Sequence, residues 1–126
     1  MKRKTVVVGA SPKIDRYSNR AVRTLVEKGH EVVPLNPAYQ EIEGLSCVSR
    51  ISEVTGPVDT VTLYLAPQHQ KGLADQLIAL HPQRVIFNPG TENPDLQAKL
   101  KASGVPYIEA CTLVLLNTNR YGTPEI

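Results

Sequence analysis

Hydrophobic residues recur along the chain in two spacings, which predict short strands alternating with helices. Runs of consecutive β-branched and aliphatic residues, bounded by glycine or proline, are typical of strands that are buried on both faces. These runs predict strands at 5–8, 31–35, 58–65, 84–87 and 106–109, with a short edge strand at 46–48.

Two intervening segments carry apolar residues three and four positions apart, a spacing that places them on one face of a helix. The first helix is expected to follow Ser18 or Asn19, either of which can cap it, and to end before Gly29. A third helix is predicted from its ends, with Asn93 as the cap, Pro94 in the first position and Gly104 as the residue that ends it. The expected apolar faces comprise Ala21, Val22, Leu25 and Val26 in the first helix and Leu73, Ala74, Leu77 and Ile78 in the second.

Strands and helices that alternate through short loops predict an α/β fold. We expect an open, doubly wound parallel sheet, Rossmann-like, in three α/β/α layers. The length of 126 residues suits a single domain over residues 1–126. In such sheets ligands bind beyond the carboxyl ends of the strands, where the strand order reverses. That rule selects the loops at 9–17, 36–40, 66–68 and 88–93.

Composition narrows the class of protein. Hydrophobic residues make up 41% of the chain and charged residues 21%, as in ordinary globular proteins. Its longest apolar runs fall far short of the roughly 20 residues that cross a bilayer, and the run at 5–8 is too short for the core of a signal peptide. A net charge of +2 is too small to indicate nucleic-acid binding. Cys47 and Cys111 lack metal-site spacing, so we expect reduced thiols in a cytoplasmic protein.

The turn after the first strand, residues 9–11, is the strongest candidate for a binding site. It leads toward a helix N-terminus, where unpaired N–H groups attract phosphate. Gly9 allows a close approach of the backbone, Ser11 adds a hydroxyl, and Lys13 brings positive charge to which two arginines add. An ordinary strand-to-helix turn with solvated basic residues would show the same pattern, and this alternative stays open.

The same turn lacks the usual dinucleotide signature. That signature would require glycines in place of Ser11 and Ile14, and an NAD site would require an acid after the second strand, where Asn36 and Pro37 stand. The glycine-lysine phosphate loop of nucleoside triphosphatases is missing as well. These absences together argue against NAD.

The other selected loops offer weaker evidence. The segment 36–37 leaves its strand in an extended shape along which an adenine or ribose can lie, and Tyr39 can stack on a base. Residues 66–67 can form an apolar wall, and residues 88–92 gather amide and hydroxyl groups. Each pattern is also that of a strand terminator, a helix start or a surface residue.

No reactive constellation is evident in the sequence. The three histidines, His30, His69 and His81, have neither metal-ligand spacing nor a defensible serine and aspartate partner. Cys111 fits a small packing residue better than a nucleophile. We therefore expect neither catalytic residues nor a bound metal.

Nearly the whole chain, from about Lys4 to Arg120, resembles the small stand-alone CoA-binding proteins. These are similar to the N-terminal nucleotide-binding domain of the succinyl-CoA synthetase α subunit. The resemblance rests on the order and spacing of several motifs, each of which is unspecific alone. They are VVVGASPK, RYSNRAVRTLVEKGHEVVPLNP, VDTVTLYLAP, VIFNPGTEN and ASGVPYIEACTLVL.

The resemblance implies a Rossmann-like domain that binds coenzyme A or an acyl-CoA through its diphosphate. In that family the first turn binds phosphate and the end of the second strand holds the adenosine. The loop after the third strand lines the ligand, and the later proline-glycine loop faces the pantetheine. The corresponding residues are Gly9, Ala10, Ser11, Ser18 and Asn19 for phosphate, Asn36, Pro37 and Tyr39 for adenosine, Ala66 and Pro67 for the lining, and Asn88, Pro89, Gly90 and Thr91 for pantetheine.

The chain departs from the family pattern in ways that keep alternatives open. Family members often carry lysines where this chain has Ala38 and Gln40, and a proline in place of Ala66. The catalytic histidine of the synthetase lies in a further domain, so ligase activity is not expected. One alternative is a small NAD(P)-dependent oxidoreductase. Another is a scaffold or regulatory subunit with a decayed nucleotide pocket, which forms a homodimer or holds a partner protein through an exposed apolar face at 111–117. Burial of that segment on the sheet is the competing interpretation.

Overall fold

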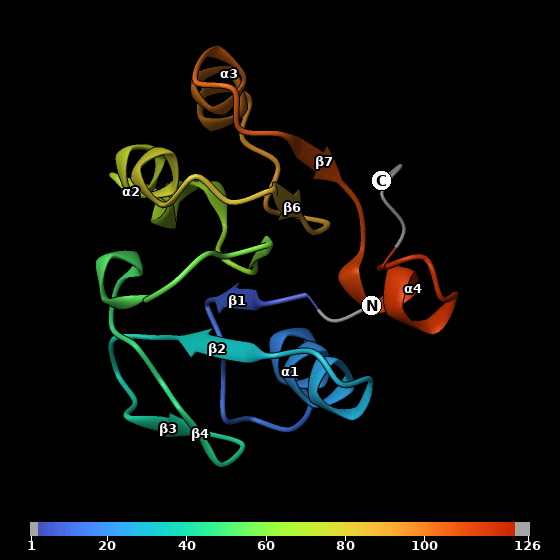
Figure 1. The fold of residues 1–126 in the computed structure, drawn as a ribbon. Helices are drawn as coiled ribbons and strands as arrows, with labels where there is room; N and C mark the ends of the chain where they lie inside the picture. The colour runs from blue at the N-terminus through green and yellow to red at the C-terminus, as the bar shows by residue number, and fades with distance from the viewer. Residues whose placement is uncertain (1–2, 123–126) are drawn as a thin grey trace.

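The computed structural model describes residues 3–122, so residues 1–2 and 123–126 of the predicted domain lie outside the described residues. Within this part of the chain, a five-stranded parallel sheet has helices on both faces (Figure 1). Its strand order, β2-β1-β5-β6-β7, confirms the predicted doubly wound α/β fold. The strands are β1 (Thr5–Val8), β2 (Val32–Leu35), β5 (Thr60–Leu63), β6 (Arg84–Phe87) and β7 (Tyr107–Glu109).

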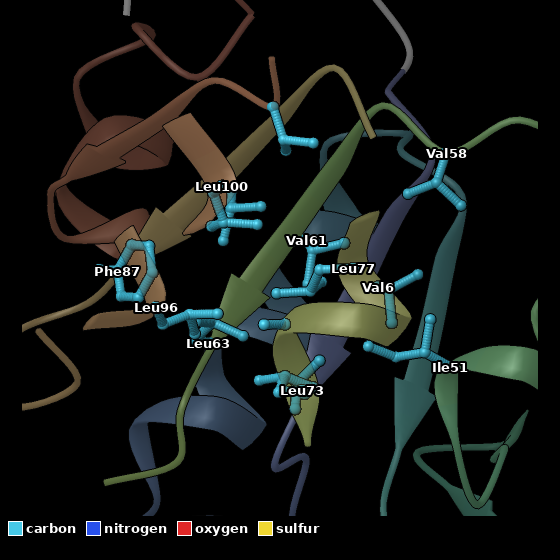
Figure 2. Close-up of a cluster of buried hydrophobic side chains, with 14 of the residues drawn as sticks. Val6, Ile51, Val58, Val61, Leu63, Leu73, Leu77, Phe87, Leu96 and Leu100 are labelled. Carbon is cyan, nitrogen blue, oxygen red and sulfur yellow. The ribbon is translucent and has the colours of Figure 1, made fainter. Parts of the chain in front are cut away.

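Alternate strand residues face two separate apolar clusters, one on each side of the sheet. Val6 and Val8 point into a cluster with Leu77 and Leu100, which Figure 2 shows from the side of the covering helices. Val7, between them, packs in the second cluster with Leu25. Because both faces are covered, every residue of β1, β5 and β6 is buried, the two threonines of β5 included.

The helices divide between the two faces. The helices α2 and α3 contact each other on one face, and α1 and α4 contact each other on the other. Among the described residues, no helix has the length and apolar character needed to cross a bilayer. The bounds are α1 (Tyr17–Glu27), α2 (Leu73–Leu80), α3 (Pro94–Ala102) and α4 (Thr112–Asn117), with the short 3₁₀ turns η1 (Ile51–Glu53) and η2 (Pro67–His69).

The start of α1 differs from the prediction. The capping position is Arg16, which makes no side-chain cap, whereas Ser18 and Asn19 lie inside the first turn with their side chains buried. The predicted cap was wrong because Asn19 uses its amide for tertiary hydrogen bonds instead. Val26 is also 47% exposed, so the apolar face of α1 is narrower than predicted. The start of α3 was predicted correctly, since the Asn93 side chain accepts from the Leu96 amide.

Two strand predictions need correction. The run 58–65 forms a strand only over Thr60–Leu63, because the neighbouring strands offer four residues each for pairing. The expected edge strand at 46–48 is replaced by a small antiparallel hairpin of β3 (Glu41–Ile42) and β4 (Leu45–Ser46). Its turn residues, Glu43 and Gly44, both have positive φ, as a type I′ hairpin turn requires. Val48 still lies beside β2, through a single bridge to Leu35.

Within the segment 111–117, Cys111 is the capping position, Thr112–Asn117 form α4, and Thr112, Leu115 and Leu116 are buried. Leu115 and Leu116 are buried in the second cluster, while Val114 is 49% exposed. This outcome agrees with the interpretation that the segment packs on the sheet.

Candidate functional site

The strand order reverses between β1 and β5. From β1 the chain crosses through α1 to β2 on one side, whereas β5 lies on the other side and leads on to β6 and β7. The loops that leave the carboxyl ends of two such strands diverge and open a crevice between them. Each of the four loops selected from the sequence follows the carboxyl end of a strand, so the sheet brings all of them to this edge.

Gly9 forms the tightest point of this edge. Its φ is +85°, and a β carbon at this position would lie 3.0 Å from the Tyr64 carbonyl oxygen and 3.0 Å from the Leu65 side chain. Both the conformation and the lack of space therefore require glycine. The turn after β1 is consequently held directly against the chain that leaves β5.

The first amides of the turn are not free to bind a ligand. The N–H groups of Gly9 and Ala10 both donate to the carbonyl oxygen of Leu35, at 3.1 and 3.2 Å. The sequence had suggested that these amides would face an anion, but they fasten the turn to the end of β2 instead. Donors for an anion must therefore come from later in the loop and from the start of α1.

The later part of the loop does supply donors and positive charge. The Ser11 hydroxyl accepts the Lys13 amide at 3.1 Å, which fixes a local turn. The Lys13 and Arg16 side chains are exposed, and the Arg20 guanidinium lies 5.6 Å from the centre of the Tyr17 ring. The opening N–H groups of α1 have no partner within the helix and carry its positive dipole end.

Asn19 positions this loop from inside the protein. Its side chain is fully buried and donates to the Ser11 carbonyl and to the Glu43 carboxylate, both at 2.9 Å, while it accepts from Arg23 at 2.7 Å. Ser18 is 5% exposed and lies in the same turn of α1. Because protein groups already bond to both the nitrogen and the oxygen of the Asn19 amide, this side chain affects a bound ligand only by holding the loop in position.

The end of β2 is joined to the same turn. The Asn36 amide donates to the Ala10 carbonyl at 2.8 Å, and its oxygen accepts from the Ala38 amide at 2.8 Å. Pro37 and Tyr39 follow on the surface, where the Tyr39 side chain is 41% exposed. Of the residues predicted to meet the adenosine, Pro37 and Tyr39 are thus accessible, and Asn36 acts as a brace between two loops.

The loop after β6 is also braced internally. The Asn88 side chain is 2% exposed and donates to the Thr62 hydroxyl at 2.6 Å and to the Leu63 carbonyl at 2.8 Å. Its oxygen accepts the Thr112 amide at 2.8 Å. Thr91 is buried too, and its hydroxyl donates to the Asn88 carbonyl. Pro89, Gly90 and Glu92 are the exposed residues of this loop.

The loop after β5 leads into a short helical turn. Ala66 precedes η2, Pro67 occupies its first position, and the Ala66 carbonyl accepts the His69 amide at 2.9 Å. Gln70, which the sequence did not single out, is buried and donates to the carbonyls of Leu65 and Thr91. It therefore ties two of the predicted loops together.

A cavity of about 280 Å³ opens on the α1 and α4 side of this edge. Among the residues that line it, Asn88 and Pro89 are predicted ligand-binding residues, and Cys111 is the residue that the sequence analysis assigns to packing. Nothing in the sequence pointed to the other three lining residues, Tyr17, Tyr64 and Leu113. A larger hollow of about 480 Å³ lies between α2 and α3 and includes Pro67. The smaller cavity is lined by Tyr17, Tyr64, Asn88, Pro89, Cys111 and Leu113.

Electrostatics keep the Tyr64 hydroxyl protonated in this cavity wall. Burial raises the pKa of Tyr64 far above its usual value, and a thiolate at nearby Cys111 would raise it further. Elsewhere, residues 3–122 contain no group of three His, Cys, Asp or Glu side chains that could hold a metal ion. His30 lies away from this edge, against Arg3 and Tyr121.

Comparison with known proteins gives a consistent result. Residues 3–117 match the family model described as CoA binding domain. A relative from Bacillus subtilis strain 168, the uncharacterized protein YneT, is 28% identical over 102 residues, which are 81% of this chain and 76% of that protein.

Solved structures share the fold. A crystal structure of an uncharacterized protein is 38% identical, with a TM-score of 0.88 over 95% of this chain and 98% of that one. The dinucleotide forming acetyl-coenzyme A synthetase 1 of Ca. Korarchaeum cryptofilum, solved with phosphate and ADP, has a TM-score of 0.74 at 22% identity. That match covers 87% of this chain and 26% of the synthetase, so it shows a common fold with one part of a larger protein.

Proposed function

This chain belongs to the CoA binding domain family, and from that premise we propose that it binds coenzyme A or an acyl-CoA without performing a chemical step on it. The family match over residues 3–117 carries the proposal. The geometry adds a crevice at the reversal of strand order, where four loops converge and most polar side chains brace the loops.

The diphosphate of the ligand is assigned to the turn between β1 and α1. Because the Gly9 and Ala10 amides are occupied by Leu35, the donors are the Ser11 segment and the opening N–H groups of α1. Lys13 and Arg16 add positive charge around the same place. Peptide N–H groups and exposed cations together favour a doubly charged linkage.

The two ends of the ligand then lie on opposite sides of this turn. The adenosine is assigned to the surface at Pro37 and Tyr39, and the pantetheine to the loops at Ala66–Pro67 and Pro89–Gly90. The Ala38 and Gln40 side chains are exposed beside the adenosine position and carry no charge. We therefore expect weaker attraction for the 3′-phosphate than a lysine at either position would provide.

Isothermal calorimetry with coenzyme A, acetyl-CoA, NAD and ATP tests the proposal. Coenzyme A should bind with the highest affinity of the four. Ser11→Asp places a carboxylate at the diphosphate position and should weaken coenzyme A binding by about tenfold or more. Ser52→Asp, at an exposed position of η1, is the matched control and should leave the affinity unchanged.

Each contrary result points to a different protein. No binding of coenzyme A at millimolar concentration would overturn the proposal, and a stable dimer or a captured partner protein would then favour a scaffold. Binding of NAD in preference to coenzyme A would favour an oxidoreductase. Coenzyme A binding that Ser11→Asp leaves intact would move the diphosphate away from this turn.

A further inference from the structure

The 280 Å³ cavity lies on the side of the crevice away from the proposed adenosine position. Its walls come from the segments that leave three strands, since Tyr64 follows β5, Pro89 follows β6 and Cys111 follows β7. The proposed adenosine position follows β2, which is the opposite edge strand of the sheet (Figure 1). The turn assigned to the diphosphate follows β1, between the two.

The order of the strands therefore matches the order of the groups in an acyl-CoA. Along the sheet the strands run β2, β1, β5, β6 and β7. Along the ligand the groups run adenosine, diphosphate, pantetheine, sulfur and acyl chain. With the first two at β2 and β1, the later groups extend over the loops that follow β5 and β6. The cavity is continuous with this path, because Pro89 of the proposed pantetheine loop and Tyr17 at the start of α1 both line it.

The side chains that line the cavity carry no charge. The Asn88 amide nitrogen donates to Thr62 and to Leu63, and its oxygen accepts the amide of the residue after Cys111. Protein groups thus already bond to both ends of this amide. The Tyr64 hydroxyl oxygen is buried, so it adds no polar contact for a ligand in the cavity. The lining therefore suits a hydrocarbon chain and offers no cation for a carboxylate.

Charged side chains near this edge lie outside the cavity. The guanidinium of Arg20 is 5.6 Å from the centre of the Tyr17 ring, but Arg20 does not line the cavity. The larger hollow between α2 and α3 lies on the other face of the sheet and has a different chemistry. Its lining includes the charged residues Lys71, Asp75, Asp95 and Lys99.

The volume limits how much of the ligand the cavity can hold. At about 30 Å³ per non-hydrogen atom, the share of one molecule in liquid water, 280 Å³ holds about nine such atoms. The sulfur, carbonyl carbon and carbonyl oxygen of a thioester use three of them. The remainder fits an acyl group of up to about six carbons.

We propose that this cavity receives the acyl chain of the ligand and makes the protein selective for short, uncharged acyl-CoAs, with chains of about four to six carbons. The selection is against free coenzyme A and against acyl chains that end in a carboxylate. This inference rests on the proposed function, because it requires the nucleotide part in the crevice. It deepens that function by naming the class of ligand.

Calorimetry with a series of straight-chain acyl-CoAs tests the inference. Burial of one methylene group favours binding by up to about fourfold, and we expect about threefold here because the cavity is open at one side. Butyryl-CoA should therefore bind about tenfold more tightly than acetyl-CoA, and hexanoyl-CoA more tightly still. Octanoyl-CoA should gain nothing over hexanoyl-CoA, since its last carbons extend beyond the cavity.

Succinyl-CoA is the matched charged ligand. Its acyl group has the same number of carbons as a butyryl group, with a carboxylate in place of the terminal methyl. Because that carboxylate would lose water without gaining a cation, succinyl-CoA should bind at least about tenfold more weakly than butyryl-CoA.

A lysine in the cavity wall should reverse this preference. Leu113 is half-buried and lines the cavity, and Leu113→Lys places an ammonium group where the carboxylate of succinyl-CoA would lie. This variant should bind succinyl-CoA at least as tightly as butyryl-CoA. Val114→Lys is the matched control, because Val114 is the next residue of α4, is 49% exposed and does not line the cavity. It should keep the wild-type preference.

Leu113→Ala provides the same test without a buried charge, should Leu113→Lys fail to fold. It lengthens the cavity, so octanoyl-CoA should then bind more tightly than hexanoyl-CoA. Circular dichroism of each variant establishes that it is folded.

The failures are distinguishable. If coenzyme A and all the acyl-CoAs bind with equal affinity, the acyl inference is wrong and the proposed function stands. Succinyl-CoA that binds wild type as tightly as butyryl-CoA would also overturn the inference, as would a folded Leu113→Lys protein with the wild-type preference. If neither coenzyme A nor any acyl-CoA binds, the proposed function itself fails.

Discussion

Gly9 lies so close to Tyr64 that a β carbon on Gly9 would be 3.0 Å from the Tyr64 carbonyl oxygen. This contact joins the turn after β1 to the chain leaving β5 at the reversal point of the sheet. We expect Gly9→Ala to destabilise the protein by about 2–4 kcal/mol, from a positive φ and from steric overlap with backbone. Urea denaturation followed by circular dichroism measures this loss.

Gly29→Ala is the matched control for that substitution. Gly29 has nearly the same φ, +86°, but nothing lies within 4 Å of the position of its β carbon. Gly29→Ala should therefore lower the free energy of unfolding only by the cost of the positive φ, about 1–2 kcal/mol. Equal losses for the two variants would show that the contact with Tyr64 contributes nothing.

Asn88 should contribute to stability rather than to ligand contact. Asn88→Ala removes three hydrogen bonds and leaves the Thr112 amide unsatisfied in a buried position, so we expect a loss of about 2–4 kcal/mol. Asn117→Ala, at the exposed end of α4, should change the free energy of unfolding by less than about 0.5 kcal/mol. A fully stable Asn88→Ala protein with weakened coenzyme A binding would instead place this side chain in contact with the ligand.

A lysine beside the proposed adenosine position should improve affinity through the 3′-phosphate. We expect Ala38→Lys to tighten coenzyme A binding by about fivefold, or about 1 kcal/mol, because Ala38 is exposed next to Tyr39. Calorimetry with 3′-dephospho-coenzyme A should show no such gain. Ala102→Lys, at the far end of α3, controls for net charge. A gain that is equal for both ligands would place the 3′-phosphate elsewhere.

His30 should make stability fall in mild acid. Its Nδ1 accepts the Arg3 amide at 2.9 Å, and burial, followed by the positive charges of the N-terminus and of Arg3 and Arg84, lowers the pKa of His30. As the pH falls, His30 therefore takes up a proton in the unfolded chain before it does so in the folded protein. The stability that neutral His30 contributes is fully present above the unfolded pKa of 6.5. It is lost as the pH falls from there through the lower pKa of the folded state.

The measurement is the free energy of unfolding in urea between pH 7.5 and the onset of carboxylate titration at about pH 5. His30→Asn keeps a side-chain acceptor for the Arg3 amide but does not titrate, so its stability should decline less over this interval. Identical pH profiles for the two proteins would contradict the role given to His30.

The candidate site was predictable at the level of loops and not at the level of atoms. Loops 9–17 and 88–93 were identified because parallel strands end at one edge and glycine, proline and asparagine mark those ends. The individual donors in these loops could not be predicted, because Asn19, Asn36 and Asn88 donate hydrogen bonds to protein groups 8 to 26 residues away in the chain. Sequence spacing carries no information on such partners.

The amino-acid sequence alone determined the alternation of strands and helices and the parallel sheet, because burial on both faces demands continuous apolar runs and local residues end each element. Only the tertiary structure decided that Arg84, predicted simply as a strand residue, would be buried over the Tyr121 ring with Arg3 and Asp59 nearby. It also decided that Cys111 and Tyr64 would share a cavity. These relations depend on segments distant in the chain, and their physical cause is the free energy that buried charged and polar groups gain from partners in three dimensions.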